Sequence, residues 1–298
     1  LSSVDIQNAK KAGVRSVEIK LSEEVQAHFK NLYKDYHGNN FEGELQAGYK
    51  RNNLWKDAVL NMDGNDHPVF VKSHGKDPTD HKYGQHFSLA IMFKEAPYPF
   101  YDKRINLVVY NRVQISNSIL DLFASKFNLM HPSFEVVIGN ENGKDPNLYY
   151  VEERINKTFF RQRKLPMINV KKGKKKHKEP AQQFAQQCFK ELKTAIQENN
   201  VEAASKFLDE DYISRVMAFR KIYGAYHGFN KENLKMGFDT LKHKFYPIVH
   251  RDVISNKVQG QYFDSFPLFD LLSKDKDYQK LVSAHLADFL KSNLSSQL

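Results

Sequence analysis

The strongest constraint on the fold is a change in hydrophobic spacing part-way along the chain. Up to about residue 153, short runs such as VRSVEIK, PVFVKSHG, HFSLAIMF and RINLVVY alternate or are continuously apolar, as β-strands are. Later, Phe184, Cys188, Leu192 and Ile196 recur every four residues, as on one face of a helix. Strands followed by helices predict an α+β fold, with a sheet-rich first half and a helix-rich second half.

Local signals refine this division. The turn residues Asp63 and Gly64 lie between two strand-like runs and predict a hairpin. Two helices are expected in the first half, a short one over SEEVQAHFKNLYKDY with Ser22 as its cap, and the main one over residues 116–129. The segment KLPMINVKKGKKKHKEP holds six lysines within 171–178 and predicts an exposed loop. We therefore expect residues 1–153 and 154–298 to form the two halves of a single folded unit.

Composition limits the partners. The net charge of +10 favours anionic partners such as a nucleotide, a nucleic acid or an acidic protein. The single cysteine, Cys188, excludes an internal disulfide framework and a cysteine-based zinc cluster. No apolar stretch approaches the roughly 20 residues of a membrane-spanning helix, so we expect no membrane span.

Two polar loops in the second half carry the residue types of phosphoryl transfer. The first holds His227 and Asn233, and the second, after the strand-like KFYPIV, holds Asp252. Phosphoryl-transfer enzymes present a base, a metal-binding Asn and a metal-binding Asp from such loops. Magnesium accepts this set because it prefers oxygen ligands and shares them with the nucleotide phosphates.

These residues lie in a longer run, YHGFNKENLKMGFDTLKHKFYPIVHRDV, that resembles the CotH family of spore-coat kinases. FEVVIGNENGKDPNLYYVEERINKTF and SFPLFDLLSKDKDYQKLVSAHL are similar to further family segments, in the same order along nearly the whole chain. The resemblance implies an atypical, two-lobed protein-kinase-like fold with an antiparallel-sheet N-lobe, one main helix in that lobe, and a mostly helical C-lobe. It implies transfer of phosphate from ATP, with Mg or Mn, to a hydroxyl of a protein substrate.

The resemblance also implies roles for particular residues. Either Lys72 or Lys82 would contact the phosphates, and Asp121 would orient that lysine. The resemblance further assigns catalysis to His227, Asn233 and Asp252, metal binding to Asn233 and Asp252, and the nucleotide side of the site to Lys72, Lys82, Asp121, Glu152 and Glu153.

Other interpretations stay open. His227 stands where many relatives carry an Asp, which is compatible with a pseudokinase-like binding or surface protein without turnover. The lysines at 171–178 would suit a polyanion, but this run lacks the interleaved aromatic residues of single-strand binders, so nucleic-acid binding is not expected. The family resemblance implies the spore or cell surface. No targeting segment appears in the sequence, and the compartment and the acceptor substrate stay open.

Overall fold

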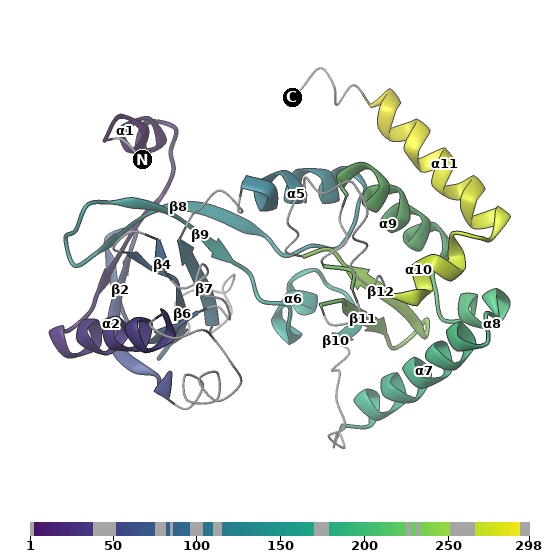
Figure 1. Cartoon of the computed structure of the whole chain (residues 1–298), viewed down its shortest axis with the longest axis horizontal. Helices are drawn as coiled ribbons and strands as arrows, with labels where there is room; N and C mark the ends of the chain where they lie inside the picture. The colour runs from purple at the N-terminus through teal and green to yellow at the C-terminus, as the bar shows by residue number, and fades with distance from the viewer. Residues whose placement is uncertain are drawn as a thin grey trace. The chain divides into compact units, whose positions relative to one another are not determined.

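The computed structural model describes residues 3–37, 52–74, 82–83, 86–95, 104–109, 115–169, 179–224, 228–230, 233–250 and 266–292 (Figure 1). Contacts divide the chain into two compact units. The barrel unit consists of Leu1–Arg112 and Ser133–Arg154, and the helical unit of Val113–Pro132 and Ile155–Leu298.

The barrel unit is built on seven strands that close on themselves in the order β1-β2-β3-β6-β7-β9-β8. Neighbours around the barrel are antiparallel except β1 and β8, which pair in parallel and complete the closure. The strands are β1 Ser16–Lys20, β2 Lys56–Met62, β3 Asn65–Ser73, β6 Leu89–Phe93, β7 Arg104–Val109, β8 Phe134–Glu141 and β9 Asn147–Glu152.

The predicted kinase-like fold is therefore wrong. A two-lobed fold with an antiparallel N-lobe sheet has free sheet edges, whereas here β1 pairs with β2 on one side and with β8 on the other. Alternation identifies strands but not their partners, and the parallel pair joins residues about 120 positions apart, Val17 and Gly139. The main helix expected in the sheet-rich half, α5 (Ile115–Lys126), belongs to the helical unit instead.

Alternate residues of the barrel strands fill its core, and α2 (Glu23–His37) adds Val25 and Phe29 to the same cluster. The backbone N–H of Val25 donates to Ser22 Oγ over 3.3 Å, which confirms Ser22 as the cap of this helix. Each fully buried aliphatic side chain contributes roughly 1.5–3 kcal/mol. The core members in the strands include Val69, Val71, Leu89, Ile91, Leu107, Val109, Val137, Tyr149 and Val151. The barrel unit also contains α1 (Ser3–Lys11) and a short hairpin of β4 (Lys82–Tyr83) and β5 (His86–Phe87).

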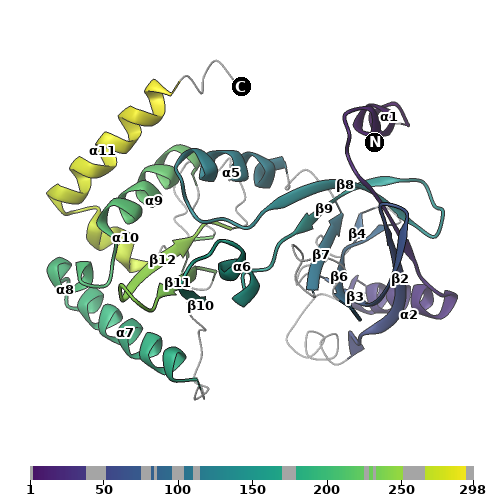
Figure 2. The same cartoon turned by 180° about the vertical axis from the view of Figure 1, so that it is seen from behind.

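The helical unit contains a small antiparallel sheet of order β10-β11-β12, with helices packed around it (Figures 1 and 2). Its strands are β10 Met167–Asn169, β11 Lys235–Asp239 and β12 Lys244–Ile248. Its helices are α5, α6 Lys157–Gln162, α7 Pro180–Gln197, α8 Val201–Ser205, α9 Glu210–Tyr223, α10 Pro267–Leu272 and α11 Lys276–Lys291.

Two predictions for the second half have different outcomes. The amphipathic helix is confirmed as α7, which buries Cys188, Leu192 and Ile196, whereas Phe184, expected on the same face, is 43% exposed. The loop predicted from residue 164 to the lysine run is wrong at its start, because residues 167–169 form β10 and pair with β11. A three-residue strand is too short to show alternation. The lysine run at 171–178 lies outside the described residues.

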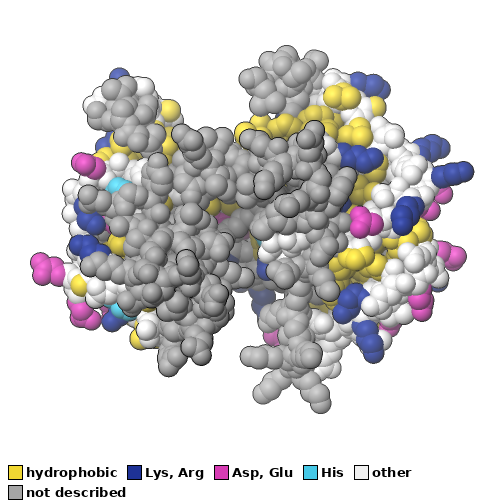
Figure 3. Space-filling model, viewed as in Figure 1, with side chains coloured by type: hydrophobic (Ala, Val, Ile, Leu, Met, Phe, Trp, Pro, Cys, Tyr) yellow, Lys and Arg dark blue, Asp and Glu magenta, His cyan; other side chains and the backbone are white. Residues whose placement is uncertain are grey.

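The described surface mixes side-chain types. Figure 3 shows basic and hydrophobic side chains interspersed on the visible face of the helical unit. No helix within the described ranges is both long enough and apolar enough to cross a membrane.

Candidate functional site

The outer face of the barrel carries a transverse row of residues from four neighbouring strands. Lys72 pairs with Ala90, Ala90 with Asn106, and Asn106 with Glu152. Successive residues of a strand point to opposite faces. The sequence neighbours of this row, including Val71, Leu89, Ile91, Leu107 and Val151, lie in the core, so the row itself lies on the outer face.

An aromatic ring and further cations extend this row. Trp55 directly precedes β2, in which Lys56 pairs with Val71, so it continues the row beside Lys72. Lys72 Nζ lies 4.9 Å, and the guanidinium carbon of Arg104 lies 5.6 Å, from the centroid of a Trp55 ring. We call Trp55, Lys72, Arg104, Asn106 and Glu152 the outer-face site.

Its electrostatics favour an anion. The pKa of Lys72 is lowered, first by burial of the ammonium group and then by the positive charges of Arg104 and Arg154. Within the described part of the chain, none of these three cations forms a salt bridge. Like charges gathered on a half-buried surface are stabilised when an anion binds among them.

The two adjacent carboxylates that were expected near the nucleotide have different partners. Glu152 is only 8% exposed, and its Oε2 accepts a hydrogen bond of 2.8 Å from Asn106 Nδ2. Glu153 Oε2 accepts from the backbone N–H of Ser133 over 3.0 Å, and its own N–H donates to the Ser133 carbonyl. Glu152 therefore belongs to the outer-face site, whereas Glu153 fixes the backbone just before β8.

The other two nucleotide-side candidates are placed differently. The backbone of Lys82 lies in β4, paired with Phe87, and its side chain lies outside the described part. Asp121 lies on α5 in the helical unit, where its Oδ1 is 2.5 Å from Nδ1 of His131. The described partner of Asp121 is therefore an imidazole and not a lysine.

The loop residues of the helical unit are described in part. Asn233 precedes β11 and His250 follows β12, and the pairing of Lys235 with Ile248 brings these two ends together. His250 Nε2 lies 2.8 Å from the carbonyl oxygen of Asn233, whose N–H donates to Asn230 Oδ1 over 2.7 Å. His227 and Asp252 lie outside the described residues. Among the residues that are described, no group of three His, Cys, Asp or Glu side chains is arranged to hold a metal ion.

No sequence pattern predicts the buried carboxyl group inside the barrel. Glu141 ends β8, is 1% exposed, and its Oε1 accepts from the N–H of Phe87 (2.7 Å) and from the hydroxyl of Tyr149 (2.8 Å). Burial raises the pKa of Glu141, against the lowering effect of these hydrogen bonds and of Lys144. Glu141 ties β5 to β8 and β9, which is a structural role.

Comparison with known proteins adds no assignment. No protein-family model matches the sequence, and no curated protein matches it. The likeness to the CotH family therefore supports a proposal and not a family assignment.

Proposed function

We propose that this chain binds ATP at the outer-face site and, with Mg²⁺ or Mn²⁺, transfers the γ-phosphate to a protein hydroxyl. The observation that carries the proposal is the gathering of Lys72 and Arg104 around Trp55, with the pKa of Lys72 lowered. Cations bind phosphate oxygens, and an indole ring stacks on a nucleobase with about 1–3 kcal/mol per base. The proposal does not need a kinase-like fold, which the closed barrel excludes.

The proposed roles follow from residue chemistry. Lys72 and Arg104 would hold the phosphates, and Trp55 would stack on the adenine. The divalent metal, when bound to the nucleotide, would neutralise the negative charge of the phosphates. The sequence resemblance assigns its protein ligands to Asn233 and Asp252, which belong to the helical unit. These assignments for Asn233 and Asp252 rest on the resemblance of the sequence alone.

A thermal-shift titration with ATP, with and without each metal, tests binding. At 100 times its dissociation constant a ligand stabilises the folded protein by about 2.7 kcal/mol. Lys72→Met is expected to remove about half of this stabilisation or more. Lys94→Met is the matched control, because Lys94 also lies over an aromatic ring, that of Phe70, but forms an ion pair with Asp57. Equal shifts in wild type and Lys72→Met would refute binding at this site.

Transfer is tested separately. Incubation with γ-labelled ATP and a mixture of acceptor proteins should label protein in wild type and not in Asp252→Ala. A nucleotide-dependent thermal shift without any labelling would favour the second candidate function, a pseudokinase-like binding protein. The observation behind that candidate is His227, at the position where the resemblance would place an aspartate base.

A further inference from the structure

Three side chains at the end of α5 lie in the order of a nucleophile, a base and a carboxylate. Ser125 Oγ lies 3.0 Å from His131 Nε2, and His131 Nδ1 lies at an ion-pair distance of 2.5 Å from Asp121 Oδ1, without a hydrogen bond between them. Nucleophilic serines are recognised by this chain of contacts and not by sequence order. We propose that Ser125 is a nucleophile activated by His131, and that this second site, independent of nucleotide, hydrolyses small activated esters.

The surroundings of His131 select the required tautomer. Nδ1 lies 3.3 Å from the carbonyl oxygen of Pro132 and 2.5 Å from Asp121 Oδ1, which accepts no hydrogen bond from a described residue. The proposal requires the neutral ring to carry its proton on Nδ1, toward these two oxygens, which would leave a lone pair on Nε2 directed at the hydroxyl of Ser125. Asp121 is a positioning residue, because it acts through His131.

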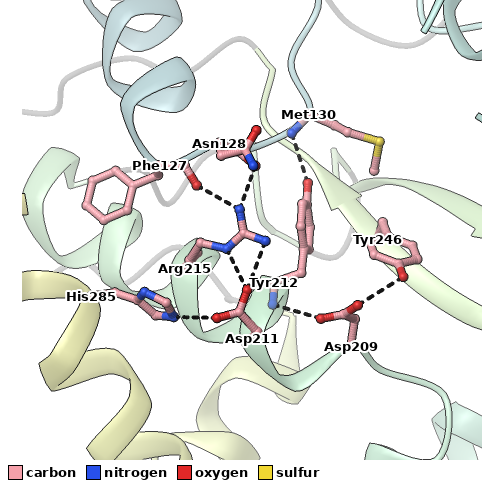
Figure 4. Close-up of polar contacts among 9 residues, drawn as sticks. All are labelled: Phe127, Asn128, Met130, Asp209, Asp211, Tyr212, Arg215, Tyr246 and His285. Carbon is pink, nitrogen blue, oxygen red and sulfur yellow. Dashed lines mark hydrogen bonds and ion pairs between the residues drawn. The ribbon is translucent and has the colours of Figure 1, made fainter. Parts of the chain in front are cut away.

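The segment between Ser125 and His131 is held from several sides (Figure 4). Arg215 donates to the carbonyl oxygens of Phe127 (3.1 Å) and Asn128 (2.9 Å), and the hydroxyl of Tyr212 accepts from the N–H of Met130 (3.0 Å).

Two further bonds hold the end of this segment. Arg163 donates to the carbonyl oxygen of His131 over 3.1 Å, and the N–H of Val249 donates to the carbonyl oxygen of Met130 over 2.9 Å. A catalytic group works only when supporting contacts fix it, and this segment has such contacts on both sides.

The step balances without a co-reactant other than water. Ser125 Oγ attacks the ester carbonyl carbon and its proton passes to His131 Nε2, while the carbonyl oxygen takes up the electron pair. Collapse breaks the bond to the alkoxy group, which leaves as an alcohol with the proton from Nε2. Water, deprotonated by His131, then releases the acid from the acyl-serine. Ser125 is exposed, so an ester can reach it.

The backbone limits the substrates. The N–H groups of Phe127, Asn128 and Leu129 already donate to the carbonyls of Phe123, Ser125 and Ala124. They are not available to stabilise an oxyanion, a contribution worth about 100- to 1,000-fold in other enzymes. We therefore assign activated esters with good leaving groups to this site, and not amides.

Labelling with a fluorophosphonate, followed by peptide mapping, tests the proposal directly. Ser125 should displace fluoride and become phosphonylated faster than Ser283, an exposed helical serine whose hydroxyl instead donates to the Gln279 carbonyl. His131→Asn keeps a donor near Asp121 but removes the base. We expect it to slow labelling at Ser125 about 100-fold or more.

Hydrolysis of p-nitrophenyl acetate gives a second readout. We expect Ser125→Ala and His131→Asn to abolish the enzymatic part, Asp121→Asn to lower it about 10-fold or more, and Ser283→Ala to leave it unchanged. Labelling of Ser125 at the rate of Ser283, or at an unchanged rate in a folded His131→Asn protein, would overturn the proposal.

Discussion

Removing the hydroxyl of Tyr212 should destabilise the helical unit strongly for so small a change. Tyr212 is 5% exposed. Its hydroxyl accepts from the N–H of Met130 over 3.0 Å (Figure 4). It also donates to the carbonyl oxygen of Pro247 over 2.8 Å, so that it joins the end of α5, α9 and β12. Tyr212→Phe keeps the ring but leaves two backbone groups without these partners.

The expected cost follows from those two groups. A buried polar group that loses its partner costs about 1–3 kcal/mol, so we expect Tyr212→Phe to lower the free energy of unfolding by about 2–4 kcal/mol. Tyr246→Phe is the matched control. Its hydroxyl donates to Asp209 Oδ2 over 3.1 Å, and this carboxylate is partly exposed, so water can replace the bond at a cost of about 1 kcal/mol.

Urea denaturation of the three proteins measures the overall cost, and hydrogen exchange measures it locally. The Met130 amide should exchange faster in Tyr212→Phe than in wild type, and Tyr246→Phe should leave its exchange nearly unchanged. If Tyr212→Phe were no less stable than Tyr246→Phe, with the Met130 amide still protected, the supporting role of Tyr212 would be refuted.

Three other changes have defined outcomes. Burial raises the pKa of Glu141 above its ordinary 4.5. The protonated carboxyl group therefore contributes to stability at low pH, and this contribution is lost as pH rises from 4.5 through the raised pKa. The urea midpoint should consequently fall more steeply with rising pH in wild type than in Glu141→Gln. Gly139→Ala places a methyl group 2.1 Å from Cδ2 of Tyr149, so overpacking should lower the free energy of unfolding by about 1–3 kcal/mol or more, measured as a lower melting temperature. Trp55→Leu should weaken ATP binding by about 1–3 kcal/mol, measured by calorimetry, whereas unchanged affinity would exclude stacking on the ring.

Local structure followed from local sequence. The hairpin predicted at Asp63-Gly64 is confirmed. Because Met62 pairs with Asn65, the loop consists of Asp63 and Gly64 alone, with φ of 52° and 82°. Such a loop needs positive φ at both positions, which Asp and Gly tolerate. The start of α9 is also set locally, because the side chain of Asp209 caps the helix by accepting from the N–H of Tyr212.

Long-range structure could not be read in this way. Closure of the barrel depends on β1 meeting β8, and the alternation within each strand is the same whether a sheet is open or closed. Likewise, Lys72 was a candidate from the resemblance, but its neighbours Trp55, just before β2, and Arg104, in β7, appear only through the register. Asp121 was interpreted as the partner of a lysine because His131 lies ten residues away, beyond the end of the helix.

The most direct test of the central claim uses the tryptophan fluorescence of the protein. The chain contains one tryptophan, Trp55, and it lies in the outer-face site. Titration with ATP and Mg²⁺ should change its emission saturably, and Lys72→Met should weaken the midpoint about 10- to 100-fold, the loss of one charge-assisted hydrogen bond. Emission that does not respond to ATP, or the same midpoint in wild type, Lys72→Met and the Lys94→Met control, would contradict nucleotide binding at this site.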